Sequence, residues 1–284
     1  MNPYLKLIRI HNVVGASIGD FAGYVVASHW HLLPERLLLS MLVVALVAMG
    51  GYVINDVFDV EIDKINKPDR PIPSGQVSLR NATLLAYSGF AFGTAISIAL
   101  GYLQALVSAI TSLLLYWYAR SLKRAGLPGN LVVALTTALS LFYGGLAYYQ
   151  GNWAALVFIP TAYSFLLTLA REIVKGIEDY VGDKAYGVRT LATTLGVERA
   201  WDVARALLLV VLITSPLPYF LGFSVIYLIL MVPFWYLTLK SLLQPKTIEG
   251  GGKARAYLKG SAFIGIVAFA LGAVPLDLLV NHFP

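Results

Sequence analysis

Long apolar runs separated by short loops fill this chain, and they restrict it to a bundle of helices embedded in a membrane. Only 13% of the 284 residues are charged, about half the share found in soluble domains. Within hydrocarbon each backbone amide needs a partner in its own segment, which favours helices. Apolar segments of about 20 residues are predicted at 12–33, 36–57, 79–101, 103–121, 130–149, 153–174, 201–221, 223–243 and 258–280. The sequence therefore predicts an all-α, polytopic membrane protein with nine transmembrane helices, forming one domain over residues 1–284.

The basic residues are distributed unequally between the two ends of these segments. Twenty of the 21 lysines and arginines fall in the N-terminus or in the loops that follow even-numbered spans, and Arg36 is alone on the opposite side. Basic loops stay in the cytoplasm. We therefore expect a multi-pass protein of the cell membrane with its N-terminus and long loops in the cytoplasm and its C-terminus outside.

Acidic residues gather at the cytoplasmic ends of the second and sixth spans. The first motif contains Asn55, Asp56, Asp59 and Asp63, and the second contains Asp179 and Asp183. Spacings of three and four residues place such side chains along one side of a helix. Both motifs read Asp-x-x-x-Asp-Lys, and four spans separate them, which indicates two four-helix repeats plus a ninth helix.

Carboxylates crowded beside hydrocarbon need cations, because desolvation and mutual repulsion are costly. Mg²⁺ prefers hard oxygen ligands and usually takes a few carboxylates together with phosphate oxygens and waters. Candidate metal ligands are Asn55, Asp56, Asp59, Asp63, Asp179 and Asp183. Candidates for binding substrate phosphates are Arg9, Asn55, Lys67, Arg70, Lys123, Arg171 and Lys175. The absence of cysteine excludes thiolate metal sites.

Such a site suits a reaction in which a diphosphate group leaves, because metal and cations stabilise the departing charge. An allylic carbocation would remain, and it needs a dry cavity and the negative faces of aromatic rings. Several aromatic residues lie near the cytoplasmic ends of spans, and among them we favour Tyr118 as a catalytic residue beside the aspartates.

These residues resemble the UbiA-type intramembrane prenyltransferase superfamily. The resemblance extends over essentially the whole chain and is carried by the two acidic motifs and by the segment from Asn66 to Gly75, which reads NKPDRPIPSG. One position departs from the pattern: many members have a tyrosine four residues before the loop lysine, whereas Tyr118 precedes Lys123 by five.

The resemblance implies nine helices around a central cavity open to lipid, with Mg²⁺-dependent transfer of a prenyl group from its diphosphate. Residues 171–179 and 118–124 are similar to the archaeal members that make ether lipids. Those members transfer a geranylgeranyl group to the free hydroxyl of geranylgeranylglyceryl phosphate. The expected partners are thus a prenyl diphosphate and a lipid-like acceptor, and nothing indicates a nucleic acid or a protein partner.

Three other functions remain to be weighed. The nearest is prenylation of an aromatic acceptor, such as a hydroxybenzoate or a naphthoate, for quinone synthesis. A CDP-alcohol phosphotransferase would need an Asp-Gly and Ala-Arg spacing that the chain lacks. A cation transporter would carry its acids in the middle of spans, whereas these lie at span ends. Asp20, inside the first span, is expected to make a structural hydrogen bond between helices.

Overall fold

The computed structural model describes residues 2–148 and 154–275, and within these residues the regular secondary structure is entirely helical. The long helices are α2 (Ile10–Ser28), α3 (Pro34–Phe58), α5 (Leu79–Ser97), α6 (Tyr102–Arg120), α7 (Leu127–Tyr148), α8 (Ala154–Glu178), α11 (Val197–Thr214), α13 (Val225–Leu242) and α14 (Ile248–Gly272). The short ones are α1 (Pro3–Leu7), α4 (Val60–Asn66), η1 (Leu122–Arg124), α9 (Tyr180–Ala185), α10 (Leu191–Leu195) and α12 (Leu217–Phe220).

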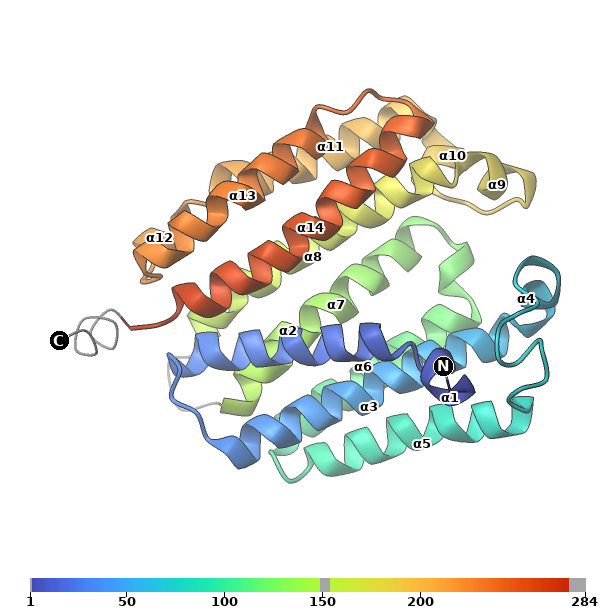
Figure 1. Ribbon diagram of the computed structural model, residues 1–284, viewed down its shortest axis with the longest axis horizontal. Helices are drawn as coiled ribbons and strands as arrows, with labels where there is room; N and C mark the ends of the chain where they lie inside the picture. Colours follow the sequence, from blue (N-terminus) through green and yellow to red (C-terminus); the bar gives the residue numbers. More distant parts are fainter. Residues whose placement is uncertain (1, 149–153, 276–284) are drawn as a thin grey trace.

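The long helices form a closed ring. Each packs against the next along the chain, and α14 packs back against α2. Figure 1 shows α2, α3, α5, α6 and α7 as one half of the molecule and α8, α11, α13 and α14 as the other. The short helices α4 and α9, which contain Asp63 and Asp183 of the two acidic motifs, lie at the same end of the bundle. The fold therefore brings both motifs to one end of the molecule.

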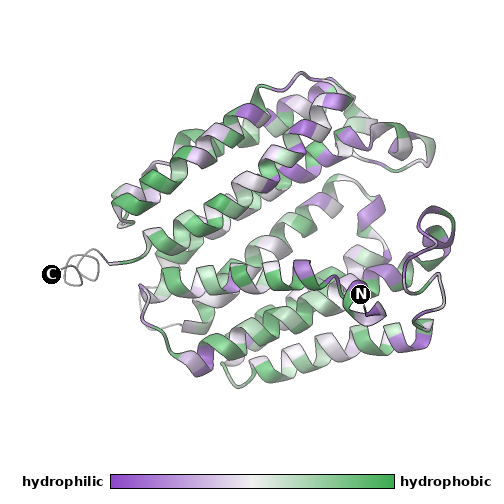
Figure 2. Ribbon diagram, viewed as in Figure 1, coloured by the Kyte–Doolittle hydropathy of each residue, from purple (hydrophilic) through white to green (hydrophobic). Residues whose placement is uncertain are grey.

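The long helices are mainly apolar, and hydrophilic residues concentrate at the end that carries α4 and α9 (Figure 2). Among the described residues, seven helices are long and apolar enough to cross a membrane: α3, α6, α7, α8, α11 extended to Phe220, α13 and α14. These helices make the chain a multi-pass membrane protein. Each of the nine predicted spans overlaps one long helix, but the count of nine spans stays a prediction.

The predicted boundaries of the last span were wrong. Helix α14 begins at Ile248, ten residues before the predicted start at 258. The hydroxyl of Thr247 accepts a hydrogen bond from the Gly250 amide at 3.1 Å, so Thr247 caps the helix. The hydropathy pattern misses this start because the first turns contain Lys253 and Arg255. The predicted end at 280 lies outside the described residues.

Both acidic motifs span a break between two helices. Asp59 separates α3 from α4 with φ −91° and ψ 0°, and Asp179 separates α8 from α9 with φ −83° and ψ 3°. The prediction that the first motif lies on one helix was therefore wrong, because Asp63 belongs to α4. The side-chain register survives the break, since Asp63 N–H still donates to Asp59 C=O at 2.8 Å. The parallel breaks are those expected of repeated units, although the repeat itself stays a prediction.

Glycines allow close helix contacts. A Cβ on Gly144 of α7 would collide with the Asp20 carbonyl of α2, and a Cβ on Gly50 of α3 would lie 2.8 Å from the Phe90 ring of α5. Substitution at either position would force the helices apart.

Two ionisable residues, Asp20 and Arg36, connect helices of the bundle. Asp20 is fully buried and accepts a hydrogen bond from the Ser40 hydroxyl of α3 at 2.8 Å, which confirms the predicted link between helices. Arg36, the lone basic residue on the far side, donates to the carbonyl oxygens of Ala147 at 2.8 Å and Leu100 at 3.1 Å. It thereby satisfies carbonyl groups at the ends of neighbouring elements, which helix ends leave without intrahelical partners.

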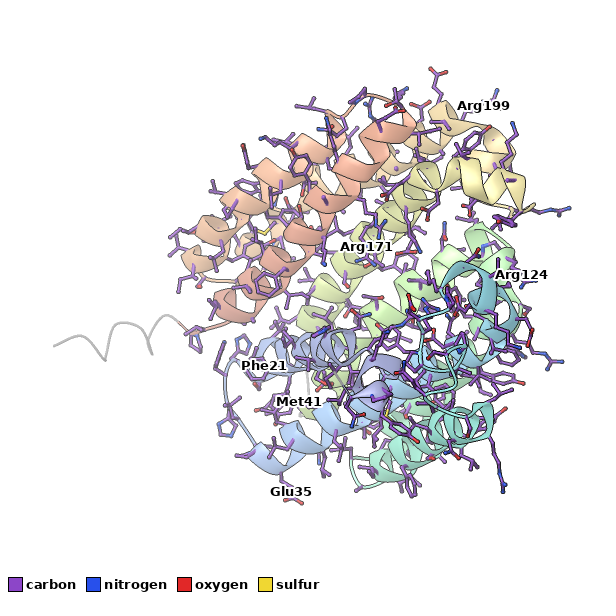
Figure 3. The ribbon with its side chains drawn as sticks, turned by 45° about the vertical axis from the view of Figure 1, so that its right-hand side comes forward. Phe21, Glu35, Met41, Arg124, Arg171 and Arg199 are labelled. Atoms are coloured by element: carbon purple, nitrogen blue, oxygen red, sulfur yellow. The ribbon has the colours of Figure 1, made fainter. Side chains whose placement is uncertain are left out.

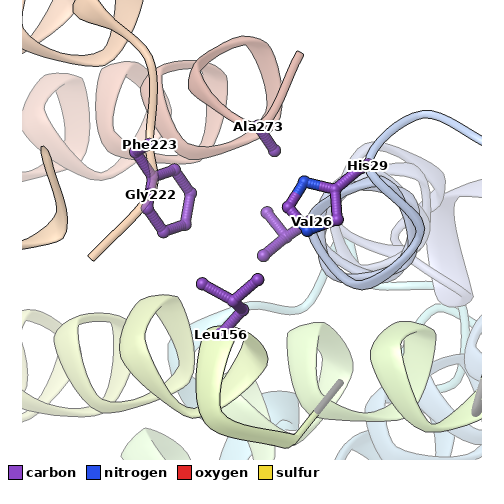
Figure 4. A pocket seen from close by; sticks show the side chains of 6 residues that line it. All are labelled: Val26, His29, Leu156, Gly222, Phe223 and Ala273. Carbon is purple, nitrogen blue, oxygen red and sulfur yellow. The ribbon is translucent and has the colours of Figure 1, made fainter. Parts of the chain in front are cut away.

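Two hollows lie away from the acidic motifs. One is lined by Val26, His29, Leu156, Gly222, Phe223 and Ala273, where α2, α8 and α14 meet the loop before α13 (Figure 4). The other has a volume of about 400 Å³ and lies between α8, α11 and α12, with Phe158, Leu166 and Leu221 in its lining. Neither is lined by an aspartate, so the candidate active site has to be built from the motifs themselves.

Candidate active site

Arg70 joins two aspartates of the first motif. Its Nη1 donates to Asp56 Oδ1 at 3.2 Å and also to Asp63 Oδ2. The Asp56 and Asp63 side chains are only 6% and 7% exposed, so their charges depend on this partner. The loop that carries Arg70 is held by the buried side chains of Ile72 and Val77. Because both carboxylates touch the same nitrogen, their oxygens lie near each other.

Asp59 forms the second half of this site. Its Oδ1 accepts a hydrogen bond from Lys123 Nζ in η1, and its Oδ2 accepts one from Asn55 Nδ2 at 3.0 Å. Tyr118 of α6 is mostly buried and interacts electrostatically with Asp59. The structure therefore brings Tyr118 and Lys123 to the same aspartate, despite their spacing of five residues.

Arg9 reaches the first motif from the junction of α1 and α2. Its φ of 52° is in the left-handed region, which non-glycine residues rarely adopt. This backbone conformation places Nη2 2.6 Å from Asp56 Oδ1 and the guanidinium 5.5 Å from the centre of the Tyr52 ring. Such strain persists where the surroundings enforce it, often at functional sites.

The second motif contains two carboxylates that repel each other. Burial raises the pKa of Asp183 above its usual value, the neighbouring Asp179 raises this pKa further, and Lys175 lowers it. A divalent cation between the two aspartates would relieve their repulsion.

Charged side chains of α8 lie within electrostatic range of tyrosines in the half of the molecule that carries the first motif. Arg171 of α8 interacts with Tyr52 of α3, and Glu172 of α8 interacts with Tyr118 of α6. Figure 3 shows Arg171 near the middle of the molecule, whereas Arg124 and Arg199 lie toward the end that carries α4 and α9. The part of α8 that lies deeper in the bundle than the second motif therefore faces Tyr52 and Tyr118, the tyrosines near the first motif.

Not every predicted residue is brought into this network. Lys67 is exposed at the end of α4, and Lys175 is exposed on α8, where it contributes only to the electrostatics of Asp183. Glu172 was not predicted from the sequence, although its spacing of seven residues from Asp179 places both on one face of a helix. The ion pair between Glu178 and Arg255 of α14, at 2.6 Å, was not predicted either, because nothing in the sequence aligns α14 with α8.

The residues present fit Mg²⁺ as part of a complex with substrate. Among the described residues, no group of three acidic or histidine side chains converges tightly enough to hold an ion unaided. Asp56 with Asp63, and Asp179 with Asp183, instead form pairs of neighbouring carboxylates. Mg²⁺ bound to phosphates commonly takes only one or two carboxylates and completes its octahedron with phosphate oxygens and waters. The donor chemistry therefore suits metal that arrives with a phosphorylated ligand.

Arg70→Ala is expected to destabilise the protein by about 3–5 kcal/mol, the scale for removing one partner of a buried ion pair. Asp63 would keep a buried charge without its ion pair to Arg70, and Asp56 would keep only its ion pair with Arg9. The measurement is the free energy of unfolding in detergent, with the exposed Arg124→Ala as a matched control. Equal stability of the two variants would contradict the structural role given to Arg70.

A ring of long membrane helices with two acidic motifs at one end, each at a helix break, defines a class of intramembrane enzyme that handles phosphorylated substrates. Residues 17–276 match the family described as the UbiA prenyltransferase family. The chain belongs to the UbiA prenyltransferase family.

Two relatives within the family are similar to this chain over nearly its full length. The chain is 59% identical to the digeranylgeranylglyceryl phosphate synthase of Metallosphaera sedula, over 100% of both chains. It is 54% identical to the enzyme of the same name from Saccharolobus solfataricus, covering 97% of this chain and 98% of the relative.

Solved structures agree with the fold. One solved structure concerns the biosynthesis of digeranylgeranylglyceryl phosphate synthase in membranes, and it is similar to this chain with a TM-score of 0.84 and 35% sequence identity. The match covers 96% of this chain and 98% of the other. A UbiA homolog from Archaeoglobus fulgidus bound to DMAPP and Mg²⁺ has a TM-score of 0.67 and 20% identity, covering 93% and 99%. The latter likeness shows the fold alone.

Proposed function

We propose that this prenyltransferase transfers a geranylgeranyl group from geranylgeranyl diphosphate to the free hydroxyl of geranylgeranylglyceryl phosphate, with Mg²⁺, in archaeal ether-lipid synthesis. The observation that carries the reaction class is the set of three aspartates, two buried and one half-buried, that each contact a basic side chain at the end of the bundle shared with the second acidic motif. The acceptor is supported by full-length relatives named for this synthesis.

The basic residues around the first motif are placed to exchange partners when substrate binds. Arg9, Arg70 and Lys123 already converge on the aspartates. Diphosphate oxygens offer the same charge-assisted hydrogen bonds, so these side chains can grip the substrate without large movements. Arg171 and Lys175 on α8 would approach it from the opposite half. When bound, Mg²⁺ would neutralise the charge that develops on the leaving diphosphate.

Aromatic side chains lie where the reacting carbon would follow the diphosphate into the membrane. Tyr118 is mostly buried near Asp59, and Tyr52 stacks beneath Arg9. Their ring faces can stabilise positive charge on an allylic carbon, and the buried setting excludes water. The acceptor oxygen, rather than a protein nucleophile, would form the new bond.

We extend the proposal to the placement in the membrane. Helices α2 and α5 would complete nine spans with the seven apolar ones, arranged as two four-helix repeats and a ninth helix around a central cavity. The distribution of basic residues supports a cytoplasmic N-terminus and active site with the C-terminus outside.

The acceptor is tested by incubating purified protein with geranylgeranyl diphosphate, Mg²⁺ and one acceptor at a time. We expect an ether product with geranylgeranylglyceryl phosphate and none with 4-hydroxybenzoate or a naphthoate. Product formed only with an aromatic acid would show that the enzyme serves quinone synthesis instead.

A further inference from the structure

Glu172 is an acidic residue of the site interior that lies outside both motifs. Its side chain is 11% exposed, and Oε1 accepts a hydrogen bond from Arg171 Nη2 at 3.1 Å. Within the part of the chain that the structure describes, the carboxylate makes no other ion pair or hydrogen bond. A largely buried carboxylate with an unused oxygen can accept a proton.

The position of Glu172 follows from helix geometry. It precedes Asp179 by seven residues, which is about 10 Å along a helix with a rotation of only about 20°. Glu172 therefore shares the face of Asp179, two turns deeper in the membrane. Tyr52 stands seven residues before Asp59 in the first half and occupies the equivalent depth. This part of α8 lies near the first half of the molecule, because Arg171 is within electrostatic range of Tyr52 and Glu172 is within electrostatic range of Tyr118.

Tyr118 lies near both Glu172 and the first motif, within electrostatic range of Glu172 and of Asp59. A diphosphate held at the aspartates would therefore place its first prenyl carbon, which lies on the membrane side of the phosphates, toward the level of Glu172. The acceptor hydroxyl has to approach that same carbon.

The other acidic residues nearby are less suited to take a proton. Asp56, Asp59 and Asp63 are proposed to bind metal, and they lie at the junction of α3 and α4, at the end of the bundle. Glu178 contacts Arg255 and lies next to Asp179 at the end of α8. Glu172 alone combines depth, burial and a free oxygen among the described acids near the motifs.

We propose that Glu172 is a catalytic residue that accepts the proton of the acceptor hydroxyl; this inference rests on the proposed function. The bond between the prenyl carbon and the diphosphate oxygen breaks, and its electron pair leaves with diphosphate. The acceptor oxygen forms a bond to that carbon and loses its proton to the Glu172 carboxylate. The carboxylic acid then returns the proton to solvent. No oxidant, reductant or further reactant is required.

A general base would act on ether formation alone, whereas a metal ligand would act on both ionisation of the diphosphate and ether formation. Loss of the base should slow ether formation and leave prenyl diphosphate binding and ionisation intact. For Glu172→Gln we expect kcat for ether formation to fall by about 10²–10⁴-fold, the usual contribution of a general base. KM for the diphosphate and the slow release of diphosphate without acceptor should stay at wild-type values. Glu172→Asp should recover part of the rate, because it restores a carboxylate.

Glu61→Gln is the matched control, because Glu61 is an exposed glutamate beside the first motif that contacts only Lys64. Thermal unfolding of each variant shows whether it has folded. Wild-type kcat in folded Glu172→Gln would overturn the proposal and indicate that diphosphate itself takes the proton. Parallel loss of ether formation and acceptor-independent diphosphate release would also overturn it, by placing Glu172 in the ionisation step. If the wild-type protein prenylates only an aromatic acid, the proposed function is wrong. The Glu172 variants would then test whether Glu172 accepts the proton of that aromatic acceptor.

Discussion

The double variant Asp59→Asn with Asp183→Asn is expected to lower turnover by at least about 10³-fold, the upper end of the cost of losing one preorganised group that stabilises transition-state charge. Asparagine keeps the size of each side chain and one oxygen but removes the negative charge that attracts a divalent ion. One residue is changed in each motif, so both halves of the proposed metal site weaken together. Diphosphate release from geranylgeranyl diphosphate is the direct measurement.

Asp202→Asn serves as the control, because Asp202 is a half-exposed aspartate of α11 whose ion pair with Lys246 lies outside both motifs. This variant should keep wild-type turnover. If diphosphate release survives in the double variant, the aspartates do not hold the metal.

Much of this site could be predicted from the sequence because its parts are local. The spacing within each motif and the apolar runs before it are readable without tertiary contacts. The proline-flanked segment around Arg70 lies close in sequence to Asp63, so the contact between Arg70 and Asp63 requires only a short loop. Positive residues on one side of the spans likewise follow from a rule that acts on each loop separately.

The parts that could not be predicted depend on contacts between distant segments. Nothing local reveals that Arg9 adopts a positive φ, because its conformation is enforced by Asp56 and Tyr52 of another helix. The start of α14 was misplaced because capping by Thr247 outweighs the polarity of its first turns. Glu172 was missed because it lies inside the predicted span 153–174 and outside both acidic motifs, whereas the structure buries it near Tyr118 of α6.

The first motif also illustrates why the position of a helix break matters. The break at Asp59 ends α3 and starts a new helix, and Asp63 of that helix contacts Arg70 in the loop that follows. One arginine can then contact two carboxylates that the sequence separates by seven residues. This arrangement concentrates charge at a point where a phosphate group can take the arginine's place.

Removal of divalent metal is expected to abolish turnover, and added Mg²⁺ is expected to restore it. The reason is the charge of the site. Its acidic residues are Asp56, Asp59, Asp63, Glu172, Asp179 and Asp183, and its basic residues are Arg9, Arg70, Lys123, Arg171 and Lys175. These charges nearly cancel, so the basic residues cannot by themselves neutralise the several added charges of a diphosphate. At an effective dielectric constant of about 20, each uncompensated pair of like charges 4 Å apart costs about 4 kcal/mol.

Divalent ions supply the missing positive charge, and EDTA should therefore weaken diphosphate binding as well as stop ether formation. The measurement is product formation and equilibrium binding of geranylgeranyl diphosphate with EDTA, before and after excess Mg²⁺. Protein treated with EDTA and then dialysed into Mg²⁺ controls for irreversible unfolding. Undiminished binding and turnover at metal concentrations held to trace levels would show that the arginines and lysines suffice, and the paired aspartates would then need another explanation.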